Sequence, residues 1–117
     1  MTNKELQESI IFQDGNFLFA NKPSGISAQD DHSQGTSFHR HLEKFSNQEL
    51  YVVHRLDRPT SGVIIYAKKK RAASYISQLL KRKSEDFTKK YLAAVKNAPT
   101  NDSGELTHTL FHDKKQR

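Results

Sequence analysis

One short segment, HRLDRPTSG at residues 54–62, holds most of the side chains that could carry out chemistry. It places a single carboxylate, Asp57, between Arg55 and Arg58. Two guanidinium groups beside a carboxylate favour its ionised form, so Asp57 suits a nucleophile or an anionic group better than a general acid. Gly62 would let the backbone or a ligand approach closely. The alternative is a solvated turn held by a surface ion pair, which contributes only about 0–1 kcal/mol.

Histidine pairs raise a second chemistry, metal binding. His39 and His41 are two residues apart in a predicted helix, where side chains at that spacing do not face each other. His108 and His112 are four apart in a predicted strand, where they share a face but lie far apart. Neither pair has the spacing of a metal site, so we expect no metal. The chain has no cysteine, which excludes disulfides and thiolate catalysis.

The charge is distributed unevenly along the chain. Residues 1–50 carry 4 basic and 7 acidic side chains, whereas residues 51–117 carry 15 basic and 6 acidic ones. A basic half favours a polyanionic partner, and nucleic acid before a membrane, because no apolar amphipathic face accompanies the charge. Charge that serves only solubility is the alternative. The sequence has no signal peptide and no apolar run of about 20 residues, which predicts a cytoplasmic protein without membrane contact. The oligomeric state is not predicted.

Strands and helices that would position the 54–62 segment follow from the apolar pattern. Asp14-Gly15-Asn16 separates two apolar runs as a hairpin turn does, and Lys22-Pro23-Ser24-Gly25 then ends the second run. Strands are predicted at residues 10–12, 17–20, 50–53, 63–67, 91–95 and 106–111, and helices at 38–45, capped by Thr36 or Ser37, and at 68–83. The fold class is therefore α+β, with a mixed, mainly antiparallel sheet and flanking helices.

The domain organisation expected from this pattern is simple. Residues 1–9 are predicted to be an N-terminal tail and residues 10–117 a single domain. The last predicted strand would leave an open sheet edge, so we expect a domain truncated at its C-terminus. An unfinished core also leaves open that the chain does not fold alone.

A family resemblance enters with the run HRLDRPTSGVIIYAK, from His54 to Lys68. It closely resembles the HRLD-x-x-TSG signature of the RluA-type pseudouridine synthases. NKPSG at residues 21–25 and KKYLAAV at residues 89–95 are similar to two further family elements, K-P-x-G and K-x-Y-L-A. The resemblance implies part of a pseudouridine synthase catalytic fold. It also implies the conversion of uridine to pseudouridine in ribosomal or transfer RNA, without a cofactor or metal.

The resemblance also implies roles for individual residues. Asp57 matches the catalytic aspartate, Tyr91 the tyrosine that stacks on the target base, and Arg55 the arginine that helps to displace the nucleotide from its stack. The loop that shapes the mouth of the pocket is matched by His54, Thr60, Ser61 and Gly62. The family also has a later motif, with a basic residue that pairs with the aspartate and an apolar residue beneath the base, and nothing after Tyr91 resembles it. A non-catalytic RNA-binding fragment that uses the basic half alone is the alternative function.

Overall fold

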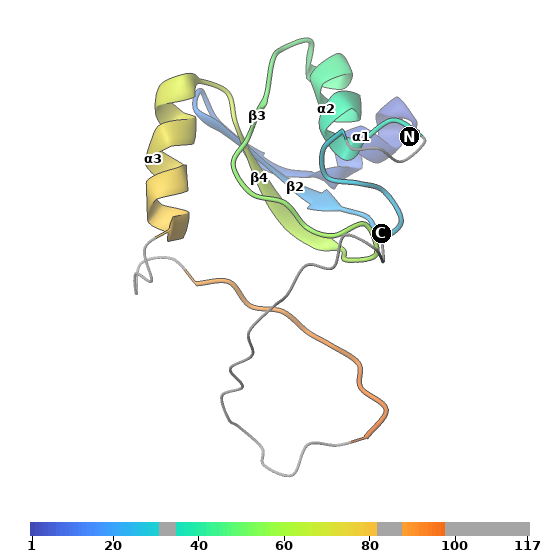
Figure 1. Cartoon of the computed structure of the whole chain (residues 1–117). Helices are drawn as coiled ribbons and strands as arrows, with labels where there is room; N and C mark the ends of the chain where they lie inside the picture. Colours follow the sequence, from blue (N-terminus) through green and yellow to red (C-terminus); the bar gives the residue numbers. More distant parts are fainter. Residues whose placement is uncertain (31–34, 82–87, 98–117) are drawn as a thin grey trace, which may run out of the picture.

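The computed structural model describes residues 1–30, 35–81 and 88–97. In this part, four strands form one sheet in the order β1-β2-β4-β3, and every neighbouring pair is antiparallel (Figure 1). The elements in chain order are α1 (Asn3–Ser9), β1 (Ile10–Gln13), β2 (Phe17–Lys22), α2 (Phe38–Ser46), β3 (Tyr51–Val52), β4 (Gly62–Ala67) and α3 (Lys70–Lys81). The predicted α+β class with a mainly antiparallel sheet and flanking helices is confirmed.

The β1–β2 hairpin forms where the sequence predicts it. A carboxylate oxygen of Asp14 accepts hydrogen bonds from the backbone N–H groups of Asn16 and Phe17, each at 2.8 Å. Such a bond between a side chain and the backbone two or three residues on stabilises a turn locally. The hairpin therefore follows from residues that are neighbours in the sequence.

The main core lies on the face of the sheet that α1 and α2 cover. Leu18 and Ala20 of β2 point to this face together with Ile64 and Tyr66 of β4, and all four are fully buried. Alternate residues of a strand point to opposite faces. Accordingly, Ile65 of β4 is buried on the other face, where α3 packs against β3 and β4. This second face is only partly covered, since Val63 of β4, two residues from Ile65, is 54% exposed.

Helices α2 and α3 confirm the two predicted helices. The hydroxyl of Ser37 caps α2 by accepting a hydrogen bond from the N–H of Arg40 at 3.2 Å. Ala72 and Ile76 form the buried side of α3, and its other positions include exposed basic side chains. None of the helices in the described ranges is long and apolar enough to cross a membrane.

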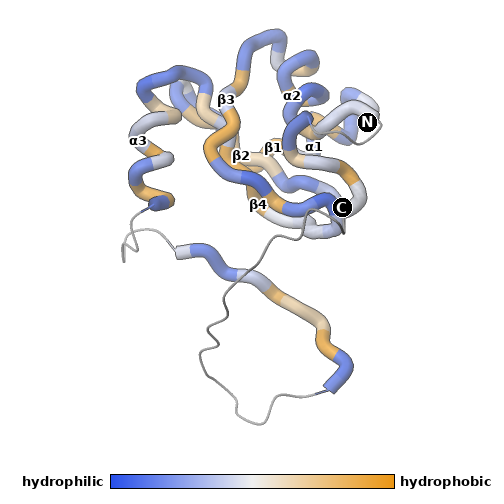
Figure 2. The backbone as a smooth tube through the Cα atoms, viewed as in Figure 1, coloured by the Kyte–Doolittle hydropathy of each residue, from blue (hydrophilic) through white to orange (hydrophobic). Residues whose placement is uncertain are grey.

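Two predictions about secondary structure are wrong. Residues 3–9 form α1 rather than a tail, because Thr2 and Glu5 make a capping box, with bonds of 3.0 and 3.1 Å, that starts the helix. Residues 91–95 form no strand, because no strand of the described part pairs with them. Figure 2 shows hydrophobic residues in the middle of the 88–97 segment and hydrophilic ones at its ends. The strand predicted at 106–111 lies outside the described residues.

Candidate active site

The 54–62 segment is a loop that leaves the sheet after β3 and returns to it at the start of β4. Leu56 anchors the loop, because its side chain is buried in the main core. The N–H of Thr60 then donates to the carbonyl oxygen of Asp57 at 2.9 Å and closes a tight turn. Asp57 is exposed to solvent beside this buried leucine.

The K-P-S-G turn at residues 22–25 lies directly against this loop. The N–H of Gly25 donates to the carbonyl oxygen of Arg58 at 2.7 Å, and the hydroxyl of Ser24 donates to that of Pro59 at 2.8 Å. Gly25 has a φ of 92°, a conformation that glycine adopts without strain. Two motifs more than 30 residues apart in the sequence are therefore joined through their backbones.

The side chain of Lys22 strengthens this junction from the inside. It is fully buried, and its ammonium group donates to the carbonyl oxygens of Pro23, Ile26 and Arg58 at 2.9, 2.8 and 3.2 Å. Burial, with the charge of Arg58, lowers the pKa of this amine, and the charge of Asp57 opposes the shift. Lys22 therefore holds both motifs from beneath and lies close enough to feel the charge of Asp57.

A small cavity of about 160 Å³ opens beside Asp57. The cavity is lined on one side by residues 55–58 and on the other by Ser27, Ala28 and Gln29. Asp57 and Arg55, which the sequence predicts in one site, are thus brought together. However, neither Arg55 nor Arg58 approaches the carboxylate of Asp57 within the 4.0 Å of an ion pair. The loop leaves the carboxylate of Asp57 exposed, and no ion pair at this residue holds the turn in the described part of the chain.

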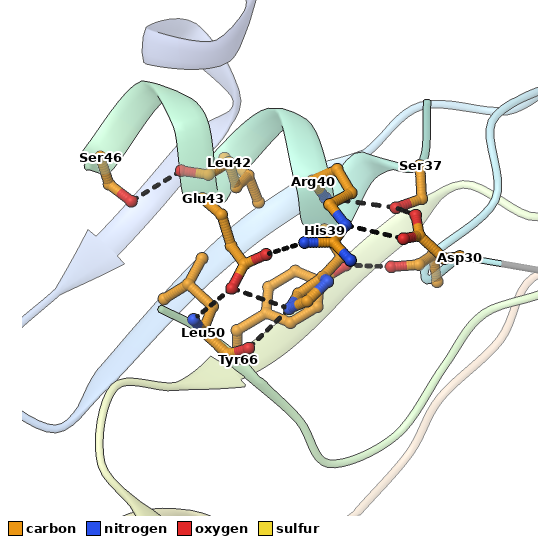
Figure 3. Close-up of polar contacts among 10 residues, drawn as sticks. Asp30, Ser37, His39, Arg40, Leu42, Glu43, Ser46, Leu50 and Tyr66 are labelled. Atoms are coloured by element: carbon orange, nitrogen blue, oxygen red, sulfur yellow. Dashed lines mark hydrogen bonds and ion pairs between the residues drawn. The ribbon is translucent and has the colours of Figure 1, made fainter. Parts of the chain in front are cut away.

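Hydrogen bonds from α2 and β4 fix the opposite wall of this small cavity. The hydroxyl of Tyr66 donates to the carbonyl oxygen of Ala28 at 2.7 Å, and Asp30 accepts from the side chains of Ser37 and Arg40 at 2.8 and 2.7 Å (Figure 3). Within this tethered stretch, Gln29 also lines the cavity. Gln29 was not among the predicted site residues.

Figure 3 also shows the polar contacts of the His39 side chain. Its Nε2 lies 2.5 Å from the carbonyl oxygen of Leu50 and 3.6 Å from a carboxylate oxygen of Glu43. His39 thus joins α2 to the start of β3, and His41 plays no part in these contacts. The structure shows no group of three or more His, Asp or Glu side chains placed to hold a metal among residues 1–30, 35–81 and 88–97. His108 and His112 lie outside these ranges.

A larger cavity, of about 630 Å³, shares Leu56 with the small one. Apolar side chains from the sheet and from the 88–97 segment line it: Phe19, Val63, Ile65 and Leu92. Four predicted site residues line it as well: His54, Ser61, Gly62 and Tyr91. Thr60 lines neither cavity, and its N–H closes the turn at Asp57.

The larger cavity is also lined by two lysines, a tyrosine and a histidine. Lys89 and Lys90 bring positive charge to it, and the ring of Tyr91, 64% exposed, is available for stacking. His54 is half-buried and accepts a hydrogen bond at Nε2 from the N–H of Ile65 at 2.9 Å. Burial, with the charge of Lys89, lowers the pKa of this imidazole. An apolar cavity with a cationic rim and an aromatic ring suits a planar base that carries a phosphate.

Lys22 is the residue that the prediction of site residues missed most clearly. In β2 it follows Leu18 and Ala20 at intervals of two, so the alternation of the strand places it on the buried face. A lysine in line with core residues therefore signalled a structural role. For Gln29 no comparable signal exists, because its position depends on contacts from α2 and β4.

Comparison with known proteins agrees with this geometry. A sequence profile of the family described as RNA pseudouridylate synthase matches residues 16–117. The chain is 31% identical over 116 residues to ribosomal large subunit pseudouridine synthase C of Rickettsia bellii, covering 97% of this chain and 38% of that protein. It is 34% identical over 106 residues to tRNA pseudouridine synthase C of Vibrio vulnificus, covering 86% of this chain and 41% of that protein.

A solved structure gives the same result for the fold. Human RNA pseudouridylate synthase domain containing 4 superposes with a TM-score of 0.54 at 30% identity, over 67% of this chain and 31% of the human one. The chain therefore spans well under half the length of each of these relatives. The resemblance inferred from the sequence is confirmed, and the chain belongs to the RNA pseudouridylate synthase family.

Proposed function

We propose that this chain carries the aspartate-bearing part of an enzyme that isomerises uridine to pseudouridine in ribosomal or transfer RNA. The observation that carries the proposal is the placement of Asp57. This carboxylate lies exposed on a loop that the buried Lys22 and the K-P-S-G turn hold fast. The names of the relatives, which specify ribosomal large subunit RNA or tRNA, support both substrate classes.

The reaction explains what such a carboxylate would do. Isomerisation breaks the bond between ribose C1′ and uracil N1, forms a bond between C1′ and C5, and exchanges the C5 proton for one at N1. No net oxidation or reduction occurs. The carboxylate could attack the base or the ribose, or remove a proton on a route through a glycal. Each route needs an ionised carboxylate whose oxygens are accessible, and Asp57 has no ion pair in the described residues.

The larger cavity is proposed to receive the base. A uridine taken out of its stack needs contacts that replace the lost stacking, which amounts to a few kcal/mol. The ring of Tyr91 and the apolar floor from β2 and β4 would supply them. Arg55, beside Asp57, would help to displace the nucleotide, and His54, Thr60, Ser61 and Gly62 would shape the mouth of the pocket. Lys89 and Lys90 would neutralise the neighbouring phosphates.

Release of tritium from RNA labelled at uridine C5 tests this proposal. We expect release with the 117-residue chain and its loss in Asp57→Asn, which keeps the size of the side chain but removes the charge. Glu49→Gln is the matched control, because it removes one exposed carboxylate away from both cavities. Equal release above background from wild type and Asp57→Asn would refute the role of Asp57.

The basic half of the chain supports one other function, RNA binding without catalysis. Three lysines and one arginine, at positions 68–71, continue from the end of β4 into α3. Binding that falls steeply with salt, is unchanged in Asp57→Asn and is not accompanied by tritium release would favour this second function.

A further inference from the structure

Strand β3 is only two residues long, so the backbone groups of β4 beyond Tyr66 need another hydrogen-bond partner. β3 pairs Tyr51 with Ala67 and Val52 with Tyr66. If this register continued, Val53 would lie opposite Ile65 and its backbone carbonyl would be the natural partner for the N–H of Ile65. Instead β3 ends at Val52, and the N–H of Ile65 donates to Nε2 of the His54 side chain at 2.9 Å.

The imidazole of His54 thereby gives the buried N–H of Ile65 a hydrogen-bond acceptor. Ile65 is only 7% exposed, and a buried N–H without a partner is strongly unfavourable. Because the imidazole accepts the bond, the backbone at residues 53–54 does not have to follow β4. The chain can then turn away, bury Leu56 in the core and bring the carbonyls of Arg58 and Pro59 against the K-P-S-G turn.

The hydrogen bond also determines the state of the ring. A nitrogen that accepts from a backbone N–H carries no proton, so the single ring proton lies on Nδ1 and the imidazole is neutral. The direction of the pKa shift of His54, downward because of burial and the charge of Lys89, agrees with a neutral ring. A proton on Nε2 would place two donors against each other.

We propose that His54 is a positioning residue, whose Nε2 replaces a backbone carbonyl at the end of β3 and thereby lets the chain leave the sheet toward Asp57. This assigns the imidazole a task within the protein in place of contact with the RNA. Its consequence for catalysis rests on the proposed function of Asp57, whereas the hydrogen bond itself does not.

Two substitutions distinguish loss of the hydrogen bond to Ile65 from loss of the imidazole ring itself. In His54→Gln the side-chain amide reaches as far as Nε2 and can still accept from Ile65, whereas in His54→Asn it reaches only as far as Nδ1. We expect the Ile65 amide of the full chain to exchange with solvent at a similar rate in wild type and His54→Gln, and about tenfold faster in His54→Asn. Nitrogen NMR of the wild-type imidazole should show Nε2 unprotonated and the proton on Nδ1.

Steady-state kinetics of the same variants on uridine-containing RNA test the effect of His54 on catalysis. His54→Asn should lower kcat about tenfold with little change in KM, and His54→Gln should recover most of the loss. A protonated Nε2 in the wild type, or equal exchange of the Ile65 amide in the two variants, would overturn the hydrogen-bond role. A rise in KM at unchanged kcat in His54→Asn would overturn the positioning role in favour of RNA contact. If neither the wild-type chain nor any variant releases tritium, the proposed function fails, and the NMR and exchange results still decide this inference.

Discussion

Replacing Lys22 with methionine removes the buried ammonium and keeps a side chain of similar length. The three carbonyl oxygens that lose a donor belong to Pro23, Ile26 and Arg58. The carbonyl of Arg58 still accepts from the N–H of Gly25, and Pro23 lies at the surface, where water can bond to it. The carbonyl of Ile26 therefore bears most of the loss. Leaving this acceptor unsatisfied is unfavourable, whereas removing a buried charge is favourable and offsets part of the cost. We expect a net loss of about 1–3 kcal/mol in the free energy of unfolding.

Urea unfolding of the full chain, followed by circular dichroism, measures this loss. The expected result for Lys22→Met is a lower midpoint at an unchanged slope, because the buried surface hardly changes. Lys44→Met is the matched control, since it removes an exposed lysine from α2. A Lys22→Met chain as stable as the control, or more stable, would refute the reasoning, because burial of the ammonium would then outweigh its three hydrogen bonds.

Three further predictions follow from single features. The pKa of His54 is lowered from its usual 6.5, so the folded state binds fewer protons than the unfolded state just below that pH. The free energy of unfolding should therefore fall as the pH drops below about 6.5, with a shallower fall in His54→Gln, and an unchanged slope would contradict this. Gly62 has a φ of 140°, so Gly62→Ala should destabilise the chain by about 1–3 kcal/mol in urea unfolding. Gly15→Ala, where no atom lies within 4 Å of an added Cβ, is its control, and equal stabilities would refute the argument. In RNA-binding titrations at several salt concentrations, Lys70→Gln and Arg71→Gln on α3 should each reduce the salt slope by about 1 if that side chain neutralises a phosphate. Unchanged slopes would exclude these two side chains from the phosphate contacts.

The parts of the fold that were predicted correctly depend on neighbouring residues. The β1–β2 turn rests on Asp14 and the two residues that bond to it, and α2 begins at a serine cap whose partner is three residues away. The N-terminal helix has an equally local signal in the capping box of Thr2 and Glu5, and it could have been found. Sequence patterns carry such signals because both partners of the interaction lie within one turn of chain.

Other features depend on contacts that no local pattern contains. The strand predicted around Tyr91 has suitable residues, but a strand exists only where another strand accepts its hydrogen bonds, and none in the described part does. The motif around Asp57 was identified from the sequence, yet its support by Lys22 and the lack of an ion pair to Arg55 emerge only from the packed loops. The motif was thus recognisable from the sequence, whereas the surroundings of its residues were not.

The ladder between β2 and β4 also affects how the chain folds. It joins residues 40 apart at Lys22↔Gly62 and 50 apart at Phe17↔Ala67. Contacts so distant in the sequence raise the contact order and slow folding, because the long intervening loop must close before they form. During synthesis, Lys22 leaves the ribosome long before its partners in the Asp57 loop. Until β4 has followed, the lysine has only the neighbouring carbonyls of its own turn, so the candidate active site forms only when the sheet itself does.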